Sequence, residues 1–173
     1  MCMLKTLTKI FKVGIVTESL ASDKISIEFE KTGSICKKLI ATKFGGSFAI
    51  RQIDAGSCNG CELEIHALNN PFYSVERFGI HFVASPRHAD LLLVTGPVSR
   101  HMQAALITAY EATPNPKLVI AVGDCGACGG EFGCSYASCG AVSNVIPVDG
   151  VISGCPPTPI DLLRGIITAL TKK

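Results

Sequence analysis

Nine cysteines in a chain of 173 residues are the side chains best able to do chemistry in this sequence. Cysteine thiolates bind iron-sulfur clusters and structural zinc, and they also react in redox enzymes. Cys2 and Cys36 lie near the start of the chain, and no special role is predicted for them. The other seven form three groups, which are Cys58 and Cys61, then Cys125, Cys128, Cys134 and Cys139, and finally Cys155.

Each group follows a stretch that is typical of a strand. DAGSCNGC follows the apolar residues 48–54, GDCGACGG follows 117–122, and GCPP follows VDGVI. In an open α/β sheet, the loops beyond the carboxyl ends of the strands converge on one crevice. We therefore expect thiols that are distant in the sequence to lie together.

The CxxC pair Cys58 and Cys61, one cysteine of the 125 loop, and Cys155 make four thiolates. Four is the number that a 4Fe-4S cluster or a tetrahedral zinc ion requires, and the Cys-Pro ending favours iron-sulfur. Residues 51–173 hold seven cysteines, one fewer than two all-cysteine clusters need, so a single cluster with three spare thiols is the simplest prediction. The third ligand could be any of Cys125, Cys128, Cys134 and Cys139, of which Cys125 lies nearest the strand end.

Glycines around the 125 loop are expected to let backbone N–H groups approach the cluster sulfurs. These glycines are Gly123, Gly126, Gly129 and Gly130.

Other thiol chemistries fit less well. A thioredoxin-type CxxC pair needs neither glycine-rich loops nor distant cysteines, and structural zinc sites usually join two pairs about 15 to 20 residues apart. Here Cys125 lies 64 residues beyond Cys61, and Cys155 lies 94 beyond it. Disulfides are disfavoured in the cytoplasm.

The composition predicts one globular domain. The chain has 16 basic and 14 acidic residues and is 47% hydrophobic, which is enough for one core. Residues 1–50 carry eight lysines against four acidic residues, whereas residues 51–173 carry eight basic against ten acidic residues. Because the second part has no concentrated basic patch, we expect no nucleic-acid partner.

The N-terminal residues predict neither a secretory signal nor a membrane span. Lysines at positions 5, 9 and 12 interrupt the apolar stretch that a signal needs, and no run approaches the roughly 18 apolar residues of a span. Residues 3–13 predict an amphipathic helix on a partner or on lipid headgroups. We therefore expect a basic leader over 1–46, an iron-sulfur α/β domain over 47–173, and a cytoplasmic location.

From Ser47 onward the pattern alternates between strands and helices. It predicts an α/β fold with a flavodoxin-like, open, mostly parallel sheet and helices on both faces. Residues 14–46 are predicted to be irregular, with a possible strand at 25–29 and one or two helical turns at 34–44. Strands are predicted at 48–54, 80–84, 90–95 and 117–122, and helices at about 60–69, at 99–112 with Ser99 as the N-cap, and at 158–171.

Five motifs occur in an order that resembles the small subunit of nickel-iron hydrogenases. The likeness is closer to the membrane-bound, energy-converting type (group 4) found in formate hydrogenlyase, which is homologous to the complex I subunit that holds the terminal cluster. It covers about residues 47–171. The motifs are SCNGC at 57–61 with Glu64, SPRHAD at 85–90, TGPV at 95–98, GDC at 123–125 before Gly129 and Gly130, and GCPP at 154–157.

This resemblance implies that Cys58, Cys61, Cys125 and Cys155 bind one proximal 4Fe-4S cluster. It implies no hydrogen-activating residue on this chain, and it implies a role for Glu64 in coupling proton movement to electron transfer. The implied partners are a large nickel-iron subunit, a ferredoxin-like iron-sulfur subunit and membrane subunits, at the cytoplasmic face of the membrane.

Two alternatives stay open. The first is the complex I-like B-type subunit of an NADH/quinone oxidoreductase, although that family has two adjacent cysteines where this chain has CNGC. The second is a zinc-stabilised scaffold. The family pattern does not require Cys128, Cys134 or Cys139, and the sequence does not identify the electron donor, whether formate, carbon monoxide or ferredoxin, or the direction of hydrogen chemistry.

Overall fold

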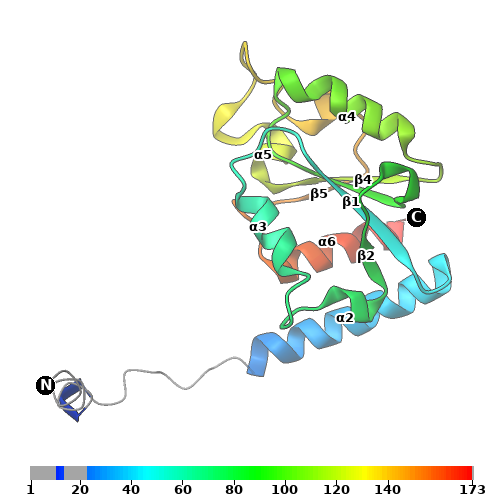
Figure 1. Ribbon diagram of the computed structural model, residues 1–173, viewed down its shortest axis with the longest axis vertical. Helices are drawn as coiled ribbons and strands as arrows, with labels where there is room; N and C mark the ends of the chain where they lie inside the picture. Colours follow the sequence, from blue (N-terminus) through cyan, green and yellow to red (C-terminus); the bar gives the residue numbers. More distant parts are fainter. Residues whose placement is uncertain (1–10, 14–22, 173) are drawn as a thin grey trace, which may run out of the picture.

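Five short parallel strands form the centre of the computed structural model, which describes residues 11–13 and 23–172 (Figure 1). The strand order is β2-β1-β3-β4-β5, and every neighbouring pair is parallel. The predicted open parallel sheet is therefore confirmed. The strands are β1 (Phe48–Asp54), β2 (Ile80–Phe82), β3 (Leu91–Thr95), β4 (Leu118–Val122) and β5 (Gly150–Ile152).

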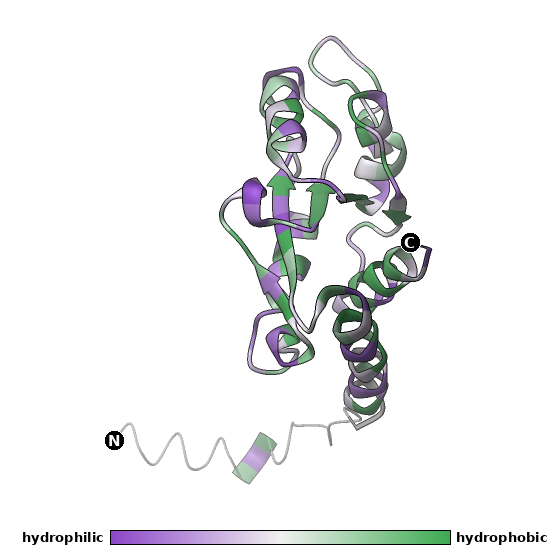
Figure 2. Ribbon diagram, turned by 90° about the vertical axis from the view of Figure 1, so that its right-hand side faces the viewer, coloured by the Kyte–Doolittle hydropathy of each residue, from purple (hydrophilic) through white to green (hydrophobic). Residues whose placement is uncertain are grey.

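Helices cover both faces of this sheet, as the pattern predicts (Figures 1 and 2). One face packs against α2, α3 and α6, and the other packs against α4 and the segment that follows α5. The Ser99 hydroxyl accepts a hydrogen bond from the Met102 backbone and caps α4, which confirms the predicted N-cap. The helices are α2 (Asp23–Phe44), α3 (Gly60–Ala67), α4 (Arg100–Ala112), α5 (Gly123–Cys128) and α6 (Pro159–Lys172).

Four short 3-10 helices lie in the connections of the described chain. They are η1 (Val75–Phe78), η2 (Pro86–His88), η3 (Gly130–Phe132) and η4 (Val142–Asn144).

The central strands are buried on both faces, and this explains why the sequence predicts them well. All residues of β3 and β4 are buried, so their sequences LLLVT and LVIAV are continuous apolar runs. The edge strand β2 is shorter than predicted and ends at Phe82 rather than at residue 84.

The irregular structure predicted for residues 14–46 is wrong for 23–44, where α2 forms 22 helical residues. Phe29, Cys36 and Ile40 are buried on one face of this helix. Gly33 lies on the same face, where an added Cβ would fall 2.2 Å from the Phe78 ring. The close approach of this ring explains a glycine in mid-helix, which otherwise disfavours helix formation.

The amphipathic helix predicted at 3–13 lies outside the described residues, except for residues 11–13, which are helical and exposed. The division of the chain at residue 46 and the contact of 1–46 with a partner or membrane stay predictions. Among the described helices, none combines the length and the apolar character that crossing a bilayer requires.

The buried thiol of Cys36 predicts a pH-dependent stability. Burial raises the pKa of Cys36 from its ordinary 9.0 to about 12. The pKa of Cys36 is higher in the folded chain than in the unfolded chain. The protonated thiol therefore makes its full contribution to stability below pH 9, and this contribution is lost as the pH rises towards 12. The loss amounts to about 1.4 kcal/mol per pH unit. In denaturant unfolding between pH 8 and 11, Cys36→Ala is expected to flatten the decline seen in the wild-type chain.

The control is Cys134→Ala, at an exposed position. It is expected to keep the wild-type dependence of the unfolding free energy on pH. Equal slopes for Cys36→Ala and the wild type would contradict the assignment.

Candidate functional site

A cavity of about 170 Å³ lies at the carboxyl edge of the sheet and is lined by four cysteines from three loops. Cys58 and Cys61 follow β1, Cys125 follows β4, and Cys155 follows β5. The structure thus brings together the four thiols that the sequence motifs point to. The other lining residues are Ser57, Gly60, Gly96, Asp124, Gly154 and Pro156.

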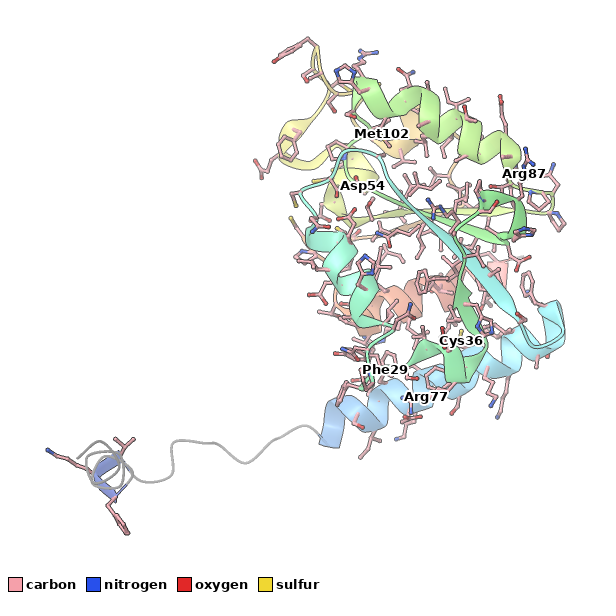
Figure 3. All side chains as sticks on the ribbon, in the orientation of Figure 1. Phe29, Cys36, Asp54, Arg77, Arg87 and Met102 are labelled. Atoms are coloured by element: carbon pink, nitrogen blue, oxygen red, sulfur yellow. The ribbon has the colours of Figure 1, made fainter. Side chains whose placement is uncertain are left out.

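The first loop is shaped by Asp54, the last residue of β1 (Figure 3). Its carboxylate accepts hydrogen bonds from the backbone N–H groups of Gly56 at 2.8 Å and Ser57 at 2.9 Å. Asn59 then adopts a left-handed conformation with φ of 70°, and α3 begins at the next residue. Cys58 and Cys61 are therefore held on either side of the start of α3.

Asp124 joins the second and third loops. Its backbone N–H donates to the carbonyl oxygen of Gly154 at 3.0 Å, and its carboxylate accepts from the Gly154 N–H at 2.8 Å. Cys125 and Cys155 are the next residues after this double contact, so it keeps their thiols at the same cavity.

Two glycines allow the backbone to lie directly against thiol sulfurs. A Cβ at Gly123, whose φ is +80°, would fall 2.6 Å from the Cys61 Sγ, and one at Gly130, whose φ is +51°, would fall 2.7 Å from the Cys125 Sγ. Only glycine fits both the conformation and the space. Added Cβ atoms at Gly126 and Gly129 would instead meet other parts of the chain, and the expected approach of the four glycine N–H groups to cluster sulfurs stays a prediction.

The four thiols influence one another electrostatically. The pKa of Cys61 rises to about 12, chiefly through burial, then through the Glu62 carboxylate and the thiols of Cys58, Cys125 and Cys155. The pKa of Cys125 is also raised, first by burial and then by Cys155 and Cys58. Ionising several of these thiols together is thus unfavourable unless a cationic group lies among them. A metal group in the cavity would supply that positive charge.

The arrangement fits a cluster better than a single ion. The four thiols surround a cavity rather than a single point. In a 4Fe-4S cluster each thiolate binds its own iron, whereas a tetrahedral zinc ion requires four sulfurs at about 2.3 Å from one point.

Next to Cys61, Glu62 is buried and only 3% exposed, and neither of its carboxylate oxygens has a hydrogen-bond partner among the described residues. The motif at 57–64 points instead to Glu64, which is half-buried. Glu62 lies three residues before the buried Ile65, so both side chains are on the inner face of α3. This spacing is the sequence signal that identifies Glu62.

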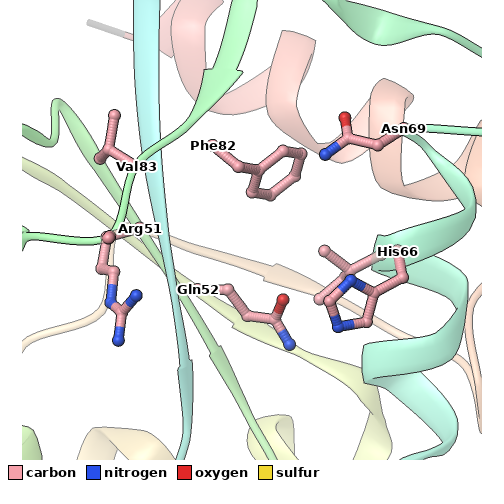
Figure 4. A pocket seen from close by; sticks show the side chains of 8 residues that line it. Arg51, Gln52, His66, Asn69, Phe82 and Val83 are labelled. Atoms are coloured by element: carbon pink, nitrogen blue, oxygen red, sulfur yellow. The ribbon is translucent and has the colours of Figure 1, made fainter.

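Three further cysteines and His66 lie outside the four-cysteine cavity. Cys128, Cys134 and Cys139 do not line it. His66 is exposed and lines a different cavity of about 280 Å³, where it faces Gln52 (Figure 4). No cysteine lines that second cavity.

Comparison with known proteins identifies the family. The family model described as NADH ubiquinone oxidoreductase, 20 Kd subunit, matches residues 58–169. The chain belongs to this family. The match begins at Cys58 and includes Cys61, Cys125 and Cys155.

Relatives in this family include two hydrogenase proteins. Formate hydrogenlyase subunit 7 of Escherichia coli (strain K12) is 43% identical over 155 residues, covering 90% of this chain but 56% of that protein. The probable membrane-bound hydrogenase subunit mbhJ of Pyrococcus furiosus is 43% identical over 143 residues, covering 83% of each chain. The resemblance to this branch of the family is confirmed.

Other relatives belong to different complexes. A B-type subunit of the NADH-quinone oxidoreductase of Herpetosiphon aurantiacus is 44% identical over 108 residues, covering 62% of this chain and 60% of that protein. A chain in the structure of the membrane-bound sulfane sulfur reductase, an archaeal respiratory membrane complex, has a TM-score of 0.59 and 35% identity, covering 73% of this chain and 67% of that one. The named relatives are thus subunits of oxidoreductase complexes.

Gly123 offers a test of the backbone contact with Cys61. Gly123→Ala is expected to lose most of the iron bound after anaerobic reconstitution, because its methyl group would displace the Cys61 sulfur. The measurement is iron per chain, together with the stability of each variant. Gly45→Ala is the matched control, since Gly45 also has positive φ, at +64°, but has open space around it. Both changes carry a backbone cost of about 1–2 kcal/mol.

Equal iron loss in the two variants would show that backbone strain, rather than contact with the sulfur, is responsible.

Proposed function

We propose that Cys58, Cys61, Cys125 and Cys155 bind one 4Fe-4S cluster. The observation that carries this proposal is the single cavity lined by these four thiols, from three separate loops. The glycine backbone against two of the sulfurs and the mutual electrostatic effect of the thiols support it. The cluster, when bound, supplies one-electron transfer.

We further propose that the chain is the electron-transfer subunit of a membrane-associated nickel-iron hydrogenase complex. The names of two relatives and the CNGC spacing at 58–61 support this assignment. Electrons pass between a ferredoxin-like subunit and a nickel-iron site in a large subunit. The chain lies peripherally at the cytoplasmic face of the membrane, next to the membrane subunits.

In this role the side chains position and tune the site rather than activate hydrogen. Asp54 and Asp124 hold the loops that carry the cysteines. Glu62 places a buried carboxyl group next to Cys61, where negative charge disfavours an additional electron. We assign to Glu64, half-buried on the same helix, the proton-coupling role that the resemblance implies.

A second candidate is a complex I-like subunit that passes electrons to a quinone. The relatives that are B-type subunits of NADH-quinone oxidoreductases favour it. The two-residue spacer between Cys58 and Cys61 favours the hydrogenase instead. A zinc-stabilised scaffold is the third alternative, and the cavity between the thiols argues against it.

Replacing a single cysteine tests the ligand assignment. Cys155→Ser is expected to abolish the cluster, reducing iron from about four atoms per chain to near zero and removing the EPR signal of the reduced protein. Cys139→Ser is the matched control, because Cys139 lies outside the cavity, and it is expected to retain both.

Equal loss from both variants would show that Cys139, rather than Cys125, is the third ligand. A colourless wild-type protein containing one zinc per chain would instead establish the scaffold alternative.

The copurifying large subunit distinguishes the two electron-transfer roles. A complex isolated through a tag on this chain is expected to contain a large subunit with two CxxC pairs of its own, because a nickel-iron site needs those thiols. It is also expected to evolve or consume hydrogen. A large subunit without these pairs, in a complex that reduces a quinone, would overturn the hydrogenase assignment.

A further inference from the structure

Two of the cysteines that lie outside the four-cysteine cavity are paired across a hairpin. Cys134 and Cys139 form an isolated antiparallel β-bridge. The hairpin follows η3 and lies beside the start of α4, where it is drawn in yellow and gold in Figure 1. A second bridge, between Ser99 and Ser138, joins it to the residue that caps α4.

The hydrogen bonds show which kind of pair the two cysteines form. The next pair towards the tip is hydrogen-bonded, because the Ser135 N–H donates to the Ser138 carbonyl at 2.9 Å. The Cys139 N–H points away from Cys134 and donates to Val98 at 2.7 Å. Cys134 and Cys139 are therefore a non-hydrogen-bonded pair, whose Cα atoms are typically about 4.5 Å apart. That separation falls within the disulfide range of about 4.4–6.8 Å.

The two thiols differ in exposure. Cys134 is exposed, whereas Cys139 is 8% exposed. The Cys134 thiol already lies against its partner and donates to the Cys139 carbonyl oxygen at 3.2 Å. The Cys139 thiol lies 3.5 Å from the side-chain oxygen of Gln103. One thiol is thus open to a reagent, whereas the other is largely buried next to α4.

We propose that Cys134 and Cys139 form a second redox site, which exchanges electrons with low-molecular-weight disulfides and is separate from the four-cysteine cavity. The Cys134 sulfur attacks one sulfur of the disulfide R–S–S–R, whose S–S bond breaks, and one R–SH leaves with a proton. The Cys139 sulfur then attacks the Cys134 sulfur and releases the second R–SH. The chain loses two electrons and two protons, and the reagent becomes two thiols.

This exchange occurs in the segment that supports Cys125. Gly130, which precedes the hairpin, lies against the Cys125 sulfur. The Gly133 N–H donates to the Gly129 carbonyl at 3.0 Å, which connects the base of the hairpin to the end of α5. A disulfide between Cys134 and Cys139 therefore fixes the two strands of the hairpin beside one wall of the cavity.

Oxidised glutathione is a suitable probe for the full chain purified without oxygen. After incubation, free thiols are alkylated and the chain is cleaved with chymotrypsin, which cuts after Tyr136. This residue is 97% exposed and lies between the two cysteines. Mass spectrometry is expected to show two peptides joined by a Cys134–Cys139 disulfide, lighter by two hydrogen atoms than the separate peptides. Reduction is expected to separate them.

Variants define the order of attack. Cys139→Ser is expected to stop at one glutathione attached to Cys134, and Cys134→Ser is expected to lose both the adduct and the cross-link. The control Cys128→Ser is expected to react as the wild type, because the Cys128 thiol is exposed and bonds within its own helix, to Asp124. A glutathione adduct that persists on Cys134 in the wild type would overturn the proposal, as would disulfides that leave Cys134 and Cys139 unjoined.

Discussion

Four strands of the sheet end at residues that are aligned with one another across the sheet, and the site depends on this register. The last residues of β1, β3, β4 and β5 are Asp54, Thr95, Val122 and Ile152, and each is the register partner of its neighbour. Every loop that carries a candidate ligand therefore leaves the sheet at the same height. A slip of one residue in a strand would exchange the side chains that pack on the two faces of the sheet, and in β1, β4 or β5 it would also move a cysteine away from the cavity.

Local contacts then convert this common height into a defined cavity. The carboxylates of Asp54 and Asp124 accept backbone hydrogen bonds in two different loops and stabilise the turns there. Gly123 and Gly130 let the chain pass close behind two of the sulfurs. The site is thus built from backbone as much as from side chains, and short polar residues and glycines matter there as much as the thiols.

The sequence predicts the sheet well because buried parallel strands leave continuous apolar runs, as in LLLVT and LVIAV. Strand ends also predict that three cysteine-bearing loops meet, but they leave four candidates in the 125 loop, and the family resemblance points to Cys125. The sequence prediction fails for α2, whose buried face includes Gly33 and Cys36 while Ile27 and Ile35 are exposed, so the amphipathic pattern is obscured. The pairing of Cys134 with Cys139 was beyond prediction, because contacts with distant Val98 and Ser99 determine that register.

The contact between α2 and α6 also bears on the order in which the protein matures. One of these helices precedes the sheet and the other follows it, and they are joined by the ion pair of Glu28 with Arg164 and by the Lys43 hydrogen bond to the Leu170 carbonyl. Cys155 lies only just before α6. During synthesis, the core beneath α3 is incomplete until α6 has left the ribosome. Because Cys155 follows β5, the four thiols of the cavity can meet only after all five strands have been synthesised.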